Sequence, residues 1–322
     1  MEQESLLLDG GPLSGPQVVR VARKGIRVSI AQNAIDAMNV ARDTVEKILK
    51  SGTPTYGINT GFGALATTSI SHGELAELQC NIIRSHAAGV GEPLDVEIVR
   101  GMMLLLAASL CRGHSGSRPI VAQTLVEMLN ANVIPVIPSR GSVGASGDLA
   151  PLAHLAMVLC GEGKATLGDK EMPGKAAMAA AGITAIIPAE KEGLALINGT
   201  HLMASIAALA LADIAMICEA AVIATAMSID AAKGTATCLD SRIHAVRGQS
   251  GQQTVANSIR EHLRGSTILT SHNEDDPRIQ DPYSFRCSPQ VLGAAIEAIA
   301  RITGTISAEL GAVTDNPLVF PA

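Results

Sequence analysis

The run from Thr200 to Lys233 constrains the fold of this chain more than any other feature, because it is almost continuously rich in residues that favour helices. At 1.5 Å per residue, a helix over this run would be roughly 50 Å long. Only 2% of the 322 residues are aromatic and none is tryptophan, so the core must be built from Ala, Leu, Ile, Val and Met. Small side chains let helices approach closely. We therefore expect a mostly α-helical protein, a bundle of long helices.

Charge and cysteine placement exclude several classes of protein. The formal net charge is -6 and the 24 Lys and Arg residues are dispersed along the chain, so nucleic acid is not an expected partner. The six cysteines stand singly, with no Cys-x-x-Cys pair, and the acidic start of the sequence is unlike a secretory leader. These features predict a cytoplasmic protein.

The most apolar stretch, Leu202 to Cys218, is interrupted by Asp213. It is also shorter than the roughly 20 apolar residues that span a bilayer. We therefore expect a buried helix here and no association with a membrane.

Apolar residues at helical spacing predict several shorter helices and one more long helix. The predicted helices cover residues 35–50, 74–86, 97–111, 119–130 and 289–310. Two prolines in the segment 134–138 exclude a central strand there. Gly, Pro, Lys and Glu are frequent between Gly161 and Gly193, so we expect a surface excursion that separates two regions. The expected division is an N-terminal region, residues 1–197, and a central helical-bundle region, residues 198–322.

The segment from Gly141 to Pro151, Gly-Ser-Val-Gly-Ala-Ser-Gly-Asp-Leu-Ala-Pro, can generate an electrophile from its own backbone. Attack of the Gly147 amide nitrogen on the carbonyl carbon of Ala145 closes a five-membered ring. Loss of two waters, one carrying the Ser146 hydroxyl, then leaves an exocyclic methylene that accepts nucleophiles. Glycine at position 147 has no Cβ to obstruct the attack. The alternative is a glycine-rich turn that enters a helix with Asp148 as its N-cap, and both interpretations can hold together.

This segment closely resembles the signature of the aromatic amino acid lyase family, which includes histidine and phenylalanine ammonia-lyases. The resemblance covers essentially the whole chain. It implies a fumarase/aspartase-like bundle of long helices with an N-terminal, mainly helical region that carries a prosthetic group. In this family the tripeptide matching Ala145, Ser146 and Gly147 forms that group, 4-methylidene-imidazole-5-one (MIO), and no external cofactor is needed. We add the hypothesis that a helix beginning at Asp148 directs its positive end at the ring.

The resemblance also implies roles for three residues outside this segment. Tyr56, in Thr-Tyr-Gly-Ile-Asn-Thr-Gly-Phe-Gly, matches the family's catalytic base and would otherwise be a packed loop tyrosine. His86, in Arg-Ser-His-Ala-Ala-Gly, belongs to the pair that helps to set substrate choice, and Ser-His resembles the histidine enzymes. Its imidazole can hydrogen-bond the ring nitrogen of an imidazole substrate. Asn198, in Asn-Gly-Thr, matches a residue beside the MIO, where the alternative is a helix N-cap region.

Residues nearer the C-terminus complete the implied site. Gln280 and Tyr283 match residues that line it, and Tyr283 is included among the expected catalytic residues. Arg286 matches an arginine that clamps the substrate carboxylate in a bidentate geometry, and without the resemblance it would be a surface charge. Asn316, in Asp-Asn-Pro, lies near the active site in the family and would otherwise belong to a turn. The acidic run 274–276 matches no metal site, so no metal is expected.

The resemblance therefore implies an ammonia-lyase that converts L-histidine to trans-urocanate, a reaction of histidine degradation. Two alternatives stay open. One is a related MIO enzyme that acts on phenylalanine or tyrosine, or an aminomutase, and the other is a non-catalytic helical assembly protein that keeps the motif without cyclising it. Family members are homotetramers whose active sites draw residues from three subunits. They continue well past the Asn-Pro motif, so the resemblance predicts a chain truncated at its C-terminus.

Overall fold

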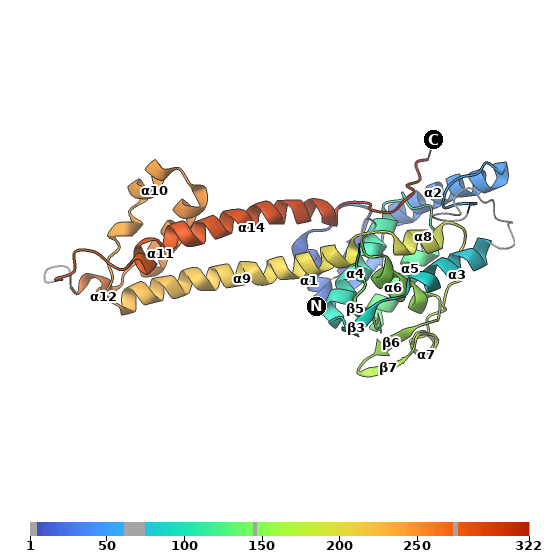
Figure 1. Cartoon of the computed structure of the whole chain (residues 1–322), viewed down its shortest axis with the longest axis horizontal. Coiled ribbons are helices and arrows are strands. Elements are labelled where there is room, and N and C mark those ends of the chain that lie inside the picture. The colour runs from blue at the N-terminus through green and yellow to red at the C-terminus, as the bar shows by residue number, and fades with distance from the viewer. Residues whose placement is uncertain (1–4, 61–74, 144–146, 273–275, 322) are drawn as a thin grey trace. The chain divides into compact units, whose positions relative to one another are not determined.

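The computed structural model describes residues 5–60, 75–143, 147–272 and 276–321 (Figure 1). The chain is mostly helical, as its composition predicts. It divides into two compact units, which are described separately. The first unit consists of residues 1–209 and 307–322, and the second consists of residues 210–306.

Helix α4 (Val96–Cys111) forms the core of the first unit, and all of its residues from Val99 to Cys111 are buried. Helices α1 (Gly15–Lys24) and α5 (Pro119–Asn130) pack against it. The bounds of α5 are those predicted from the sequence, and its first residue is a proline, which suits this position because a proline there forfeits no intrahelical hydrogen bond.

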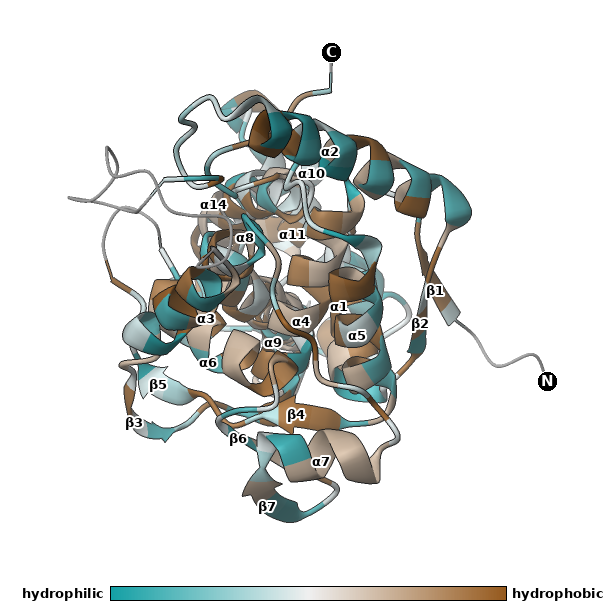
Figure 2. Ribbon diagram, turned by 90° about the vertical axis from the view of Figure 1, so that its right-hand side faces the viewer, coloured by the Kyte–Doolittle hydropathy of each residue, from teal (hydrophilic) through white to brown (hydrophobic). Residues whose placement is uncertain are grey.

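Two further helices of the first unit, α2 (Gln32–Ser51) and α3 (Leu75–His86), lie close to the expected bounds. Helix α2 carries hydrophilic residues on one side and hydrophobic residues on the other (Figure 2). Helix α3 packs against both α6 (Leu149–Leu159) and α8 (Glu192–Ile197). The predicted Ser-His pair lies at the end of α3. The helix that carries this pair therefore packs against α6, which follows the candidate MIO segment.

The strands among the described residues of the first unit form three small sheets. Parallel strands β1 (Ser5–Leu8) and β2 (Arg27–Ile30) make one sheet, and antiparallel β3 (Val90–Pro93) and β5 (Pro138–Arg140) make another. The third sheet is antiparallel and has the order β4 (Val133–Pro135), β6 (Lys164–Leu167), β7 (Lys170–Pro173). The proline-containing β4 lies at an edge of this sheet, which agrees with the exclusion of a central strand.

The expectation of a surface excursion between Gly161 and Gly193 is met only in part, because many residues of this stretch are exposed but it also forms regular structure that packs on the unit. Strands β6 and β7 and helix α7 (Gly174–Ala180) fill this stretch, and they bury Ala165, Ala177 and Met178 against the rest of the unit. The packing is not evident from the composition, because glycine, lysine and glutamate at the turns make the stretch resemble a surface loop.

The two long helices are α9 (His201–Ala231) and α14 (Ser288–Leu310), close to the predicted 200–233 and 289–310 (Figure 1). Both belong partly to each unit, so the division of the structure differs from the expected boundary after residue 197. The expectation that Leu202 to Cys218 is buried is correct for only part of the stretch, because Met203 is 45% exposed and Met216 and Ile217 are 63% and 64% exposed. Both helices are long and apolar enough to cross a membrane, a property that core helices of soluble proteins share.

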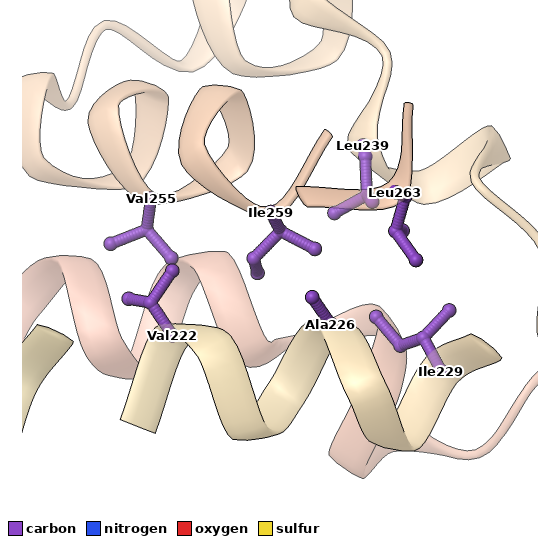
Figure 3. Close-up of a cluster of buried hydrophobic side chains, with 7 residues drawn as sticks. All are labelled: Val222, Ala226, Ile229, Leu239, Val255, Ile259 and Leu263. Carbon is purple, nitrogen blue, oxygen red and sulfur yellow. The ribbon is translucent and has the colours of Figure 1, made fainter. Parts of the chain in front are cut away.

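The described residues of the second unit form helices joined by loops, with no strand among them. A one-turn 3-10 helix (Thr237–Leu239) follows α9. The helices after it are α10 (Ser241–Arg247), α11 (Ser250–Leu263), α12 (Thr267–Thr270), α13 (Tyr283–Arg286) and the first part of α14. Its core is a cluster of seven buried side chains from α9, the 3-10 helix and α11, namely Val222, Ala226, Ile229, Leu239, Val255, Ile259 and Leu263 (Figure 3). Leu292 and Ile296 of α14 pack against this cluster.

Candidate active site

Of the candidate MIO tripeptide, Gly147 lies within the described residues, and Ala145 and Ser146 lie outside them. The two flanks of the tripeptide are joined by hydrogen bonds. The Val143 N–H donates to the Gly147 carbonyl at 3.2 Å, and the Ser142 hydroxyl donates to the carboxylate of Asp148, the residue after the tripeptide, at 2.7 Å. Because ring closure must bring the first and third residues of the tripeptide together, flanks that are held close favour it.

Gly147 is also joined to the Asn-Gly-Thr segment. It forms an isolated parallel bridge with Gly199, and the Asp148 N–H donates to the Gly199 carbonyl at 3.0 Å. The φ angle of Gly147 is +69°, and a Cβ at this position would lie 3.0 Å from the Gly199 carbonyl oxygen. Both facts require glycine at position 147. The backbone that must react is therefore placed beside the residue that follows Asn198.

The carboxylate of Asp148 caps a different helix from the one expected. Asp148 is the residue before α6, but its side chain makes no capping bond to that helix. Instead it accepts hydrogen bonds from the N–H groups of Leu202 and Met203, at 2.8 and 3.1 Å, in the first turn of α9. It also accepts one from the Ser142 hydroxyl at 2.7 Å. Burial raises the pKa of Asp148, and these hydrogen bonds oppose the rise.

Helix α6 begins at Leu149, as the capping pattern predicts, and α9 begins two residues after Gly199. The start of α6 is thus close to Gly147 in the sequence, and the start of α9 is close to Gly199, to which Gly147 is bridged. A helix start carries partial positive charge, which favours negative charge developing nearby. The hypothesis that α6 directs this charge at the ring stays a prediction.

Asn198 directly follows the short buried helix α8. Its side-chain amide donates to the carbonyl of Asn316 at 3.2 Å and to the carbonyl of Leu194 at 3.3 Å. The segment that contains Asn316 thus lies beside Asn198, although the two residues are far apart in the sequence. The structure brings these two predicted site residues together with Gly147.

Tyr56 lies in a loop that is closed by its own polar groups. The Thr55 N–H donates to the side-chain oxygen of Asn59 at 2.7 Å, and the Asn59 amide donates to the Thr53 carbonyl at 2.9 Å. Tyr56 itself is 40% exposed. The expectation that it would otherwise be a packed loop residue is therefore met only in part, because its side chain retains access to solvent.

The residue after Tyr56, Gly57, packs against α8 and against the segment that contains Asn316 and Pro317. Gly57 has a φ angle of +75°, and a Cβ there would lie 2.8 Å from a methyl carbon of Leu194 and 3.0 Å from the Cδ of Pro317. The loop can make this close approach because position 57 is glycine. Tyr56, Asn198 and Asn316 therefore come from three adjacent segments of the first unit.

His86 ends α3, and its Nδ1 lies 2.8 Å from the Ile82 carbonyl oxygen. A carbonyl accepts only, so Nδ1 is the donor, and in the neutral ring Nε2 then remains an acceptor. Such an acceptor matches the N–H of an imidazole substrate. Three residues after His86, the Gly89 N–H donates to Nε2 of His154 on α6. This hydrogen bond joins the loop after α3 to the helix that follows the candidate MIO segment.

Gln280, Tyr283 and Arg286 lie in the second unit. Tyr283 is 71% exposed, and the Arg286 guanidinium lies over its ring, 4.4 Å from the centroid. The Nε of Arg286 donates to the Asp281 carbonyl at 2.8 Å. Gln280 and Arg286 line a mostly polar cavity of about 570 Å³ within this unit, together with His272, Asp276 and Arg278. Two guanidinium groups, of Arg278 and Arg286, and two carboxylates, of Asp276 and Asp281, line this cavity, and Arg278 is paired with Asp276.

His201, the first residue of α9, is a buried titratable group that sequence reasoning missed. Its ring occupies the space that a Cβ on Gly199 would need, and its Nδ1 has no hydrogen-bond partner among the described residues. Burial, with a smaller contribution from the charge of Arg112, lowers the pKa of His201 to about 4. The described residues also contain no group of three or more His, Cys, Asp or Glu side chains that could hold a metal ion.

This site and fold define a class of protein. Residues 13–322 match the aromatic amino acid lyase family, and the chain belongs to that family. Two curated relatives are histidine ammonia-lyases. The enzyme of Treponema denticola is 45% identical over 100% of this chain, and the enzyme of Paracidovorax citrulli is 44% identical over 98% of it. The chain spans 63% and 62% of the length of these two relatives.

Solved structures confirm the fold. Histidine ammonia-lyase from Trypanosoma cruzi has a TM-score of 0.88 and 39% identity, and the match covers 99% of this chain and 59% of that one. Phenylalanine aminomutase from Pantoea agglomerans has a TM-score of 0.91 and 30% identity, over 98% of this chain and 64% of that one. The predicted mostly helical fold of this family is therefore correct, and the roles of the individual site residues stay predictions.

Proposed function

We propose that the protein is an ammonia-lyase that converts L-histidine to trans-urocanate and ammonia. The observation that supports this proposal is the arrangement around Gly147, whose carbonyl accepts a hydrogen bond from Val143 and whose backbone is bridged to Gly199, the residue after Asn198. The 44% to 45% identity to histidine ammonia-lyases supports histidine as the substrate. The reaction breaks the bond from Cα to nitrogen and a C–H bond at Cβ, forms the double bond between these carbons, and releases ammonia.

The residues around Gly147 fit an MIO group. Position 147 holds a glycine because a Cβ would contact the Gly199 carbonyl oxygen and the terminal methyl group of Met203. The flanks of the tripeptide are hydrogen-bonded to each other, and the sequence supplies the serine hydroxyl that must leave. When formed, the group supplies an electrophile that ordinary side chains lack.

The chain's own residues then have distinct tasks. Tyr56 acts as the general base that removes the proton from Cβ, and Asn198 orients the reacting groups through its side-chain amide. His86 accepts a hydrogen bond from the substrate imidazole through Nε2, because its Nδ1 is committed to the Ile82 carbonyl. Arg286 binds the substrate carboxylate, with Gln280 and Tyr283 beside it and Asn316 beside Asn198.

We also propose that the protein works as a cytoplasmic homotetramer with shared active sites. Exposed apolar side chains on α9 and α14 support an assembly, since large amounts of exposed apolar surface mark interaction sites. These side chains are Met203, Ile206, Ile214, Met216, Ile217, Ile223 and Met227 on α9, and Val291 and Ile302 on α14. Replacing both Met216 and Ile217 with lysine is expected to give smaller species by light scattering, and an unchanged mass would contradict this assembly.

The substrate is tested by incubating the purified protein separately with L-histidine, L-phenylalanine and L-tyrosine and identifying the products. Formation of trans-urocanate from histidine supports the proposal. Cinnamate, coumarate or a β-amino acid would instead indicate another activity of the family. If no substrate is converted and the protein has its full sequence mass, the alternative of a non-catalytic helical protein is favoured.

A further inference from the structure

An ion pair is completely buried in the first unit. The Nζ of Lys191 lies 2.6 Å from Oδ2 of Asp315, and the two side chains are 0% and 3% exposed. The two residues are 124 positions apart in the sequence. This pair therefore joins the segment after α14, which contains Asp315, to the start of α8.

The pair is held at a cost in free energy. Removing two charges from water is unfavourable, and burial lowers the pKa of Lys191 and raises the pKa of Asp315, whereas their mutual attraction opposes both changes. The backbone of Lys191 is also left-handed, with a φ angle of +74°, which is unfavourable for a residue with a Cβ. Residues held in such conformations are often found at functional sites.

The Lys191–Asp315 pair belongs to a set of contacts that also includes two predicted site residues, Asn198 and Asn316. Lys191 is the residue before α8, and Asn198 is the residue after it. The Asn198 amide donates to the Asn316 carbonyl at 3.2 Å, and the Asn316 N–H donates to Oδ1 of Asp315 at 2.6 Å. Both ends of a six-residue helix are thus bound to the same short segment, 315–316.

The loop that carries Tyr56 depends on the same two elements. Gly57 fits between Leu194, which lies in the middle of α8, and Pro317, which follows Asn316. A change in the separation of α8 from the segment 315–317 would therefore move the Tyr56 loop as well as Asn198.

We propose that Lys191 and Asp315 are positioning residues that set the placement of Asn198, Asn316 and the Tyr56 loop for the elimination step. This inference rests on the proposed ammonia-lyase activity. Neither residue acts on the substrate directly. They act through the side-chain amide of Asn198 and through the packing of Gly57.

The test compares the single variant Lys191→Met, the double variant Lys191→Met/Asp315→Leu and the wild type. The single variant leaves an uncompensated buried carboxylate and should be less stable, whereas the double variant removes both charges and should regain stability. Thermal unfolding, intact mass, kcat and KM are measured for each. We expect the double variant to keep the mass deficit of two waters and a KM close to that of the wild type, but to lose about 100-fold in kcat.

A nearby ion pair supplies the matched control. Arg42 and Glu190 form a pair at 3.0 Å whose side chains are mostly buried, and Glu190 directly precedes Lys191. The Arg42 side chain comes from α2, and its hydrogen bonds go to Glu46 and to Glu190. The double variant Arg42→Met/Glu190→Leu should therefore change stability and leave kcat near the wild-type value.

The outcomes separate the two proposals. A stable Lys191→Met/Asp315→Leu variant with wild-type kcat would overturn the positioning role, because the pair would then serve stability alone. If that variant does not fold, Asp315→Asn keeps the side-chain volume and an acceptor oxygen, and it decides the question: a lower kcat at unchanged KM supports the role, and a wild-type kcat overturns it. A wild type that forms no product from histidine would instead refute the proposed function.

Discussion

The two units of the chain present their candidate site residues in opposite ways. In the first unit, Asp148 and Asn198 are buried, and each is hydrogen-bonded to segments that are distant in the sequence. In the second unit, Gln280 and Tyr283 are exposed, and the contacts described for Arg286 stay within residues 281–286. Asp148 and Asn198 are thus held in place by contacts within the first unit. Gln280 and Tyr283 of the second unit instead remain accessible from outside that unit.

This contrast assigns different tasks to the two units. A group that takes part in a reaction must be held in place before the substrate arrives, and the paired, buried groups of the first unit meet that condition. A group that recognises a carboxylate can be completed by a partner subunit or by the substrate itself. We therefore expect changes to Tyr56, Asp148 and Asn198 in the first unit to act mainly on kcat or on stability, and changes in the second unit to act mainly on KM. His86, which the proposed function assigns to substrate recognition, is the exception in the first unit.

The largest effect is expected for Tyr56→Phe. Loss of the general base should lower kcat about 1,000-fold, within the range that positioned bases contribute. The intact mass should keep its two-water deficit, since the tyrosine is not part of the ring. Urocanate formation followed by absorbance measures the rate. Turnover within a few-fold of the wild type would refute the assignment of Tyr56 and the expected role of the first unit.

The next effect concerns the cap of α9. Asp148→Ala removes the acceptor of the Leu202 and Met203 N–H groups, so the free energy of unfolding should fall by about 3 kcal/mol. Asp148→Asn keeps one acceptor oxygen and serves as the control, with a smaller loss. Urea unfolding measures both. An alanine variant as stable as the wild type would show that this buried carboxylate does not organise the unit.

A pH effect is expected from His201. Because burial lowers its pKa to about 4, the folded protein binds fewer protons than the unfolded chain between pH 6.5 and 4, and stability is lost as the pH falls through this range. At pH 5 the loss relative to pH 7 is about 2 kcal/mol.

The variant His201→Gln isolates this contribution, because the raised pKa values of Asp148 and Asp315 act in the opposite direction and cancel in the difference. The stability gap between variant and wild type, measured by urea unfolding, should change by this amount between pH 7 and pH 5. A gap that does not vary with pH would contradict the buried, neutral state of His201.

The smallest effect is expected for Arg286→Lys in the second unit. Lysine keeps the charge but loses the bidentate geometry, so KM for histidine should rise about tenfold with little change in kcat. Arg278→Lys is the matched control, since Arg278 lines the same cavity but is bonded to Asp276. A change in kcat alone for Arg286→Lys would break the proposed division between the units.

The sequence was a good guide to the helices and a poor one to the polar network. Helices α5, α9 and α14 could be predicted because local composition and a proline or glycine at the ends determine them. The burial of α9 could not be predicted, because an apolar helix is compatible with a core inside one chain or with an interface between chains.

The polar groups that organise the first unit escaped prediction for a different physical reason. Lys191 resembles a surface lysine in sequence, and Asp148 resembles a cap of its own helix, yet the partners of both come from remote segments. Such pairings depend on the tertiary fold, which no local pattern encodes. The resemblance to the family supplied Asn198 and Asn316 separately, and the structure added the hydrogen bond between them.

The intact mass of the assembled protein tests the central claim most directly, with Ser146→Ala as the reference. We predict that the wild type is lighter than its sequence mass by two water molecules and that the variant has its full sequence mass and does not release ammonia from histidine. A wild type with its full sequence mass that still converts histidine to urocanate would contradict the claim that the backbone at Ser146 supplies the electrophile.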